Sequence, residues 1–113
     1  MGSNQKNSDP KAPGNSPART GKKVEINNAV RKELEVLTAN FDGTRLVATF
    51  KNRNKQTLRN LSISYTARKG RQTVDTGRIR ANRDEIGPTE EVGFKTTLDQ
   101  DADVIELIAV DSN

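Results

Sequence analysis

The chain has 113 residues, of which 31% are hydrophobic and 30% charged, with a formal net charge of +4 and no Cys, His or Trp. This length allows one domain. Without Cys and His, the usual zinc sites, haem and iron–sulfur ligation, disulfides, and Ser-His-Asp or Cys-His catalysis are excluded. No apolar run approaches the roughly 20 residues that a membrane-spanning helix needs.

Residues 1–23 have the composition of a solvated tail. Their only members of the hydrophobic set are Met1, Ala12 and Ala18, and three prolines stand among Gly, Ser and Asn. Such a segment cannot offset its own ordering entropy, and it lacks the apolar core of a signal peptide. We therefore predict a disordered basic tail or tether over residues 1–23 and a folded domain over residues 24–113.

The net charge of +4 comes from the tail, because positive and negative side chains balance in the rest of the chain. Within the domain the signs are separated. Residues 31–83 contain 13 Lys and Arg against four acids, whereas residues 84–113 contain one Lys against nine acids. If the two parts lie on adjacent strands, cross-strand pairs of opposite charge neutralise each other. The alternative is a dipolar surface that orients a charged partner.

Residues 27–38 carry two competing patterns. Behind an asparagine that could cap a helical turn, apolar residues recur at helical spacing at Val30, Leu34, Leu37 and Phe41. Over the same stretch apolar and acidic residues alternate, which is strand spacing. We predict a strand over about 33–40, because the Asp42-Gly43 dipeptide that follows is a strong hairpin signal.

Alternation with a period of two predicts the strands that follow. In chain order we expect a strand from Leu46, a polar turn at 52–57, a regular strand at 60–68, a turn at 69–71, a weak edge-like strand at 72–80, a loop at 86–88, a strand at 92–98, an acidic turn at 99–103, and an apolar strand at 104–110. The last suits a central strand packed on both faces.

Strands at this spacing, joined by short turns, are typical of an antiparallel sandwich or barrel. We predict an all-β fold: a six- to seven-stranded antiparallel immunoglobulin-like sandwich with a disordered N-terminal tail. Phe41, Phe50 and Phe94 stand at core positions of their strands, and Tyr65 points inward.

Three stretches have a more specific pattern. They are an apolar strand that ends in Asn (Leu46 to Asn52), an alternating strand that runs into a Gly turn (Leu61 to Gly70), and a Gly-Pro-x-Glu turn that leads to Phe (Ile86 to Phe94). Together they resemble the small immunoglobulin-like sandwiches of bacterial envelope proteins, FxLYD-type domains in particular. Tyr65 is followed by Thr66, where the name-giving motif has Asp.

Domains of that kind usually lie outside the cytoplasmic membrane, on a lipid anchor or a membrane helix. The resemblance therefore implies a non-enzymatic binding or assembly module of the bacterial cell envelope, a lipoprotein-like extracytoplasmic domain with the tail as its spacer. In this interpretation Met1 stands where a lipidated Cys would be. The alternative is a native cytosolic start. The implied partner is another protein or an envelope component, with membrane contact only through a lost lipid anchor.

The densest group of basic side chains is our candidate partner-binding site, and we call it the basic cluster: Arg68, Lys69, Arg71, Arg78, Arg80 and Arg83. Single-stranded nucleic acid would require aromatic side chains between these charges for base stacking. Tyr65 is the only tyrosine, and its strand position points it inward, so nucleic acid is the less favoured partner. Protein or polyanion contact and a solvated strand face are the other interpretations.

The acidic side chains predict no catalytic or metal site. Asp99, Asp101 and Asp103 alternate as calcium ligands do, but Gly and Glu are missing at the EF-hand offsets, so we expect a solvated acidic turn. Glu90 and Glu91 are adjacent and point to opposite faces of a strand, which prevents joint acid–base chemistry. We predict no enzyme activity, no cofactor, no metal and no small-molecule substrate.

Two other classes of function stay open. A cytosolic nucleic-acid- or ribosome-associated protein is favoured by the basic tail. A structural subunit of a phage or secretion apparatus would pair through an edge strand such as residues 72–80.

Overall fold

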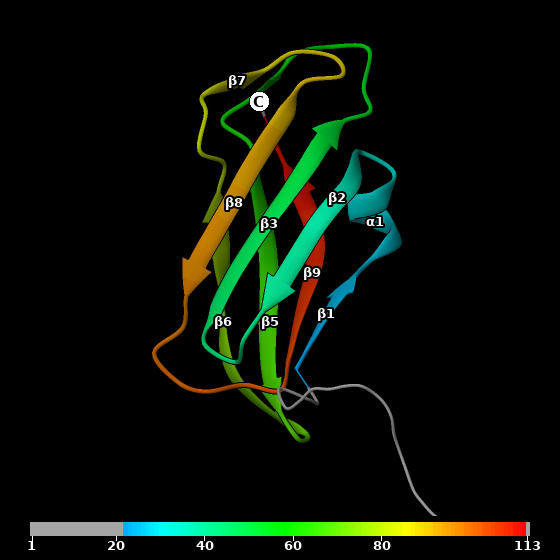
Figure 1. Ribbon diagram of the computed structural model, residues 1–113. Helices are drawn as coiled ribbons and strands as arrows, with labels where there is room; N and C mark the ends of the chain where they lie inside the picture. Colours follow the sequence, from blue (N-terminus) through cyan, green and yellow to red (C-terminus); the bar gives the residue numbers. More distant parts are fainter. Residues whose placement is uncertain (1–21, 113) are drawn as a thin grey trace, which may run out of the picture.

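The computed structural model describes residues 22–112, which form two packed β-sheets and one helical turn (Figure 1). The strands are β1 (Lys23–Ile26), β2 (Leu34–Phe41), β3 (Arg45–Asn52), β4 (Leu58–Arg59), β5 (Ser62–Lys69), β6 (Gln72–Arg80), β7 (Glu85–Ile86), β8 (Glu91–Thr97) and β9 (Val104–Asp111). Helix α1 spans Asn28–Arg31. Within the described residues, no helix is long and apolar enough to cross a membrane.

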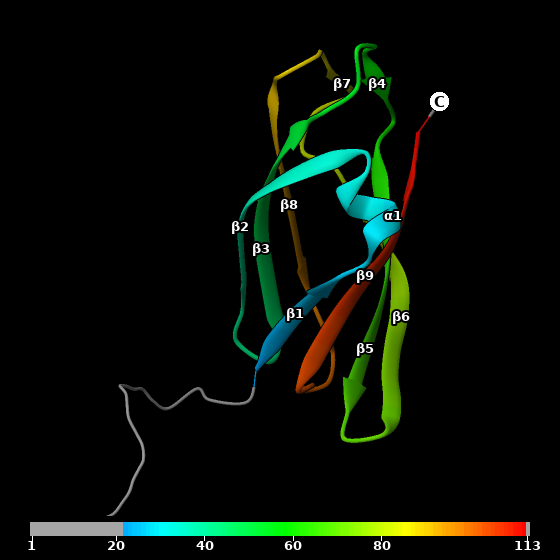
Figure 2. The same cartoon turned by 90° about the vertical axis from the view of Figure 1, so that its right-hand side faces the viewer.

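The strands build one sheet in the order β1-β9-β5-β6, a second in the order β2-β3-β8, and a small pair of β4 and β7. Figure 2 shows the two larger sheets as face-to-face layers, with β4 and β7 at one end. Seven strands make up these two sheets, so the predicted all-β sandwich and its strand number are confirmed. One feature differs from the prediction of an antiparallel sandwich, because β1 pairs with β9 in parallel. The pairs β2–β3, β3–β8, β5–β6 and β5–β9 are antiparallel.

Both patterns over residues 27–38 are realised, one after the other. The side chain of Asn27 accepts a hydrogen bond from the N–H of Ala29 at 3.0 Å and caps the single turn of α1. Val30 on this turn is fully buried. The chain then becomes extended at Leu34, where β2 begins, which confirms the predicted strand.

The core lies between the two large sheets and is centred on two aromatic rings. Phe50 of β3 and Phe94 of β8 pack edge to face, with ring centroids 5.5 Å apart and planes at 87°. Both are buried, as is Tyr65 of β5 at 8% exposure, so these predictions are confirmed. Phe41 is only half-buried, because it ends β2 at the open edge of its sheet, beside the hairpin turn.

Strand β9 is the central strand that its apolar sequence predicts, since it lies between β1 and β5. Ile105 and Leu107 on its inner face are buried. The expectation that both faces are fully packed was wrong. The outer face carries Glu106, which is half-buried and ion-paired, because no second layer covers this side of the sheet.

The folded part of the chain includes two residues that the prediction assigned to the tail. Lys23 begins β1, and its N–H donates to the carbonyl of Asp103 at 2.9 Å. Lys22 contacts the same loop through its side chain. The rest of the predicted tail, residues 1–21, lies outside the described residues.

Candidate functional site

The structure divides the basic cluster among several places. Its members are Arg68 and Lys69 at the end of β5, Arg71 in the turn before β6, Arg78 and Arg80 along β6, and Arg83 in the loop before β7. They are spread along the β5–β6 hairpin, from the end of β5 to the loop after β6. The six side chains do not form a single binding surface.

Arg68 joins three adjacent strands. Its guanidinium donates to Glu106 at 2.8 Å and to Glu25 at 3.1 Å, and the three residues lie on β5, β9 and β1. Its hydrogen bond to Glu106, with a smaller contribution from Glu25, raises the pKa of the Arg68 guanidinium. With both carboxylates engaged, Arg68 stabilises the sheet and is not free to bind a partner.

Three further members of the cluster have carboxylate partners: Arg78 with Asp111 at 2.9 Å, Arg83 with Glu90 at 3.1 Å, and Lys69 with Asp101 at 3.8 Å. Each of these acids comes from residues 84–113. The expectation that the acidic part of the chain neutralises the basic strands is therefore confirmed for these pairs. Within residues 22–112, no carboxylate pairs with Arg71 or Arg80.

Strand β6 ends the four-stranded sheet and has an unpaired edge. The N–H of Ala81 donates to the carbonyl of Leu61 at 2.9 Å, and hydrogen-bonded pairs alternate with non-bonded pairs in an antiparallel ladder. The backbone groups of Thr76, Arg78 and Arg80 therefore point away from β5, toward the edge. We call this stretch, Asp75–Arg80, the β6 edge.

Both ends of the β6 edge are defined by the backbone. A register shift between Ala67 and Arg68 leaves Val74 as an extra residue on β6, and such a bulge interrupts strand pairing. At the other end, Ala81 bridges to Phe94 of β8, and the N–H of Asn82 donates to the carbonyl of Gly93 at 3.0 Å, so β8 closes the edge beside Arg80 and the free part ends at Ile79. A strand that adds to this edge can therefore pair with about five residues.

The inner side of the β6 edge is lined by an aromatic ring. A Cβ on Gly77 would lie 3.2 Å from the hydroxyl oxygen of Tyr65, so the ring occupies the space that a side chain at residue 77 would fill. The Tyr65 hydroxyl donates to Asp75 at 2.9 Å. Burial, and then this hydrogen bond to the Asp75 carboxylate, raise the pKa of Tyr65 to about 12.

A lysine occupies the acidic turn that the sequence compares with calcium ligands. The Lys22 ammonium donates to Asp101 at 3.2 Å, to Asp103 at 3.4 Å and to a backbone carbonyl at 3.2 Å. The N–H of Gly70, and then Lys22, hold the pKa of Asp103 below its ordinary value. The turn is therefore an internal ion-pair site rather than a freely solvated loop. Residues 22–112 hold no group of three or more candidate metal ligands.

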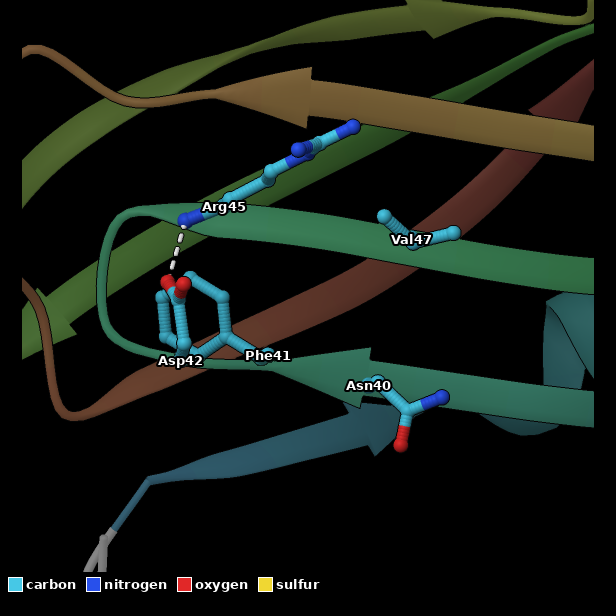
Figure 3. Close-up of a pocket in the computed structure, with 5 residues that line it drawn as sticks. All are labelled: Asn40, Phe41, Asp42, Arg45 and Val47. Atoms are coloured by element: carbon cyan, nitrogen blue, oxygen red, sulfur yellow. Dashed lines mark hydrogen bonds between the residues drawn. The ribbon is translucent and has the colours of Figure 1, made fainter.

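An open depression lies on the β2–β3 hairpin, lined by Asn40, Phe41, Asp42, Arg45 and Val47 (Figure 3). Its one carboxylate is already used. Asp42 accepts from the backbone N–H of Arg45 at 2.7 Å and of Thr44 at 3.0 Å, and these two bonds lower the pKa of Asp42. The carboxylate of this depression holds the hairpin turn, so we assign the depression no ligand.

Glu90 and Glu91 serve separate structural roles. Glu90 accepts from the N–H of Gly87 at 2.6 Å and pairs with Arg83, and these contacts lower its pKa, with the Gly87 bond as the largest cause. Glu91 lies on β8 opposite Lys51 of β3. The two carboxylates share no site.

Sequence reasoning missed the two features that matter most at this surface. It named Arg78 for its charge, but the unpaired backbone of Arg78 and Thr76 appears only when the sheet order is known. It quoted Asn52 as part of a pattern without a role, whereas this side chain is 2% exposed and fully hydrogen-bonded.

Comparison of the chain with protein-family models, with curated proteins and with solved structures finds no significant match in any of the three. The resemblance to FxLYD-type domains therefore stays a prediction from the residues quoted above.

Proposed function

We propose that the chain is a non-enzymatic protein-binding or assembly module that holds an extended segment of a partner on the β6 edge. The observation that carries this proposal is the pair of residues with unpaired backbone groups, Thr76 and Arg78, on an exposed strand at the end of a sheet. Backbone hydrogen bonds supply affinity in strand addition, and the side chains beside them supply specificity.

The expected location of this module is the bacterial cell envelope, outside the cytoplasmic membrane. The support is the resemblance of the three sequence stretches to envelope domains. The coding sequence upstream of Met1 tests it, because a lipoprotein signal peptide that ends in Cys is expected there. A translation start directly at Met1, without such a signal, would contradict the envelope location but not strand addition.

Of the alternatives, a structural subunit of a phage or secretion apparatus would use the same edge, with a neighbouring subunit as the partner. A nucleic-acid-binding role has less support. Four of the six residues of the basic cluster are paired with carboxylates, and the only tyrosine lies in the core.

Amide hydrogen exchange on the full chain tests strand addition. The probe is a peptide of alternating Ser and Val, which is neutral and readily extended. At millimolar peptide, exchange should slow at Thr76 and Arg78 and stay unchanged on β3 and β9. If the peptide protects no amide of β6, or protects another strand instead, the proposed function is wrong.

A matched pair of variants separates the backbone from the side chain at this edge. Thr76→Pro removes an N–H that points to the edge and is not needed for pairing with β5, so the fold should be retained and peptide binding lost. Thr76→Val keeps the N–H and should bind as the parent does. Equal binding by both variants would show that the peptide docks elsewhere.

A further inference from the structure

The outer side of the β6 edge carries two arginines, of which Arg78 is ion-paired with Asp111 at 2.9 Å and Arg80 has no carboxylate partner within residues 22–112. Side chains at Thr76, Arg78 and Arg80 lie on the solvent face of the sheet, and all three are exposed. The one acid of this stretch, Asp75, belongs to the inner side, where it is bonded to Tyr65. Outward side chains of an added strand would therefore meet two guanidinium groups and a hydroxyl.

The inner side of the β6 edge favours apolar side chains of a partner over acidic ones. The ring of Tyr65 lies beside Gly77, Ile79 is buried, and Val74 is half-buried against the core. An apolar side chain of the partner would lie beside the exposed backbone of Gly77. An acid there would face the carboxylate of Asp75, and two like charges at such a place oppose binding.

We propose, resting on the proposed function, that the partner is an extended segment of another protein in which acidic and apolar residues alternate. The acidic residues lie on the outer face beside Arg78 and Arg80, and the apolar residues lie inward against Tyr65 and Gly77. The segment pairs with residues 75–79, between the bulge at Val74 and the crossing to β8.

A second copy of this chain fits the edge less well. Two β6 strands paired edge to edge would bring four arginines into one two-stranded ribbon, from Arg78 and Arg80 of each copy. Like charges on paired strands are destabilising, and basic residues on an edge are a known protection against self-pairing. The charge that opposes self-association favours an acidic strand.

Three peptides of equal length test the charge preference on the full chain: alternating Glu and Val, Ser and Val, and Lys and Val. At low ionic strength the Glu peptide should bind about tenfold more tightly than the Lys peptide, with the Ser peptide between them. The difference should shrink as salt is added, because exposed pairs are screened.

Two variants test whether Arg78 and Arg80 cause the preference for the acidic peptide. The double variant Arg78→Gln and Arg80→Gln should bind the three peptides equally while keeping its affinity for the Ser peptide. Asp111→Asn removes the present partner of Arg78, 2.9 Å away, and should tighten binding of the Glu peptide by about threefold.

The outcomes distinguish this inference from the proposed function. If all three peptides protect the β6 amides with equal affinity, strand addition stands and the acidic partner is wrong. If none protects them, both fail. Concentration-dependent dimers of the full chain that disappear in Thr76→Pro would show that a second copy is the occupant, and would also overturn the acidic partner.

Discussion

The side-chain amide of Asn52 donates a hydrogen bond to the backbone carbonyl of Ile86 at 3.0 Å, across 34 residues of sequence. The same amide also reaches the carbonyls of Gln56 and Gly87, and the side-chain oxygen accepts from the N–H of Asn54 at 2.8 Å. One buried side chain thus joins the end of β3 to one end of the β4–β7 pair, where β4 begins and β7 ends.

Asn52→Ala should lower the free energy of unfolding by on the order of 2–3 kcal/mol, because it leaves buried carbonyl groups without a donor. Urea denaturation measures the change. Asn40→Ala is the control, since Asn40 is exposed on the outer face of its sheet. This substitution should change the free energy of unfolding by no more than about 0.5 kcal/mol. Equal effects of the two substitutions would contradict the role of Asn52.

Phe50→Ala and Phe94→Ala should each cost on the order of 3–5 kcal/mol, because each removes one ring of a buried edge-to-face pair. Phe41→Ala should cost roughly 1–2 kcal/mol, since Phe41 is half-exposed at the hairpin. Thermal and urea unfolding measure the loss of stability in each of the three variants and so give their order. A Phe41 variant as unstable as the Phe50 variant would place the core elsewhere.

Thr89→Gly should raise the free energy of unfolding by about 1 kcal/mol. Thr89 has a φ of +65°, a conformation that is strained for a β-branched residue and free of strain for Gly. Its N–H donates to the carbonyl of Asn52 at 3.1 Å, and Gly keeps this bond. Thr89→Ala is the comparison, because Ala retains the Cβ and should gain less than Gly.

Tyr65 should titrate near pH 12 in the folded protein, because burial and the bond to Asp75 raise its pKa from the ordinary 10.0. The chain has one Tyr and no Trp, so tyrosinate absorbance reports this residue alone. Because the pKa of Tyr65 is higher in the folded than in the unfolded state, the protonated hydroxyl stabilises the fold. This contribution to the free energy of unfolding is complete below pH 10 and is lost as the pH rises toward 12. Tyr65→Phe should remove that alkaline loss, and an absorbance midpoint near 10 with the fold intact would contradict the burial of the hydroxyl.

Acid should destabilise the fold through Asp42, Glu90 and Asp103, whose pKa values are lowered by backbone N–H groups. For a lowered pKa, the stabilising contribution is present above the ordinary values of 3.8 and 4.5 and is lost as the pH falls through the lower folded-state values. The urea midpoint measured against pH shows this loss. Glu90→Gln keeps an acceptor for Gly87 but cannot titrate, so its midpoint should fall less steeply with acid than that of the parent.

Local patterns in the sequence were sufficient for most of the strands. Alternation between polar and apolar residues predicted β3, β5, β6 and β8, because a strand with one buried face requires that pattern. The Asp42-Gly43 pair placed the first hairpin, since Gly43 adopts a φ of +111° in the turn. The short apolar alternation of Val24 and Ile26 was too brief to predict β1.

Tertiary structure alone decided the rest, because those features depend on residues far apart in the chain. The sheet order makes β6 an edge with unpaired backbone groups, and no local pattern specifies which strands are neighbours. Packing across the sandwich likewise gives Asn52 its partners at Ile86 and Gly87, and strand neighbours pair Arg68 with Glu25 and Glu106. The sequence by itself determined which residues are charged and which are apolar. Strand neighbours decided which charges are neutralised and left Thr76 and Arg78 on an edge where the backbone is free to pair.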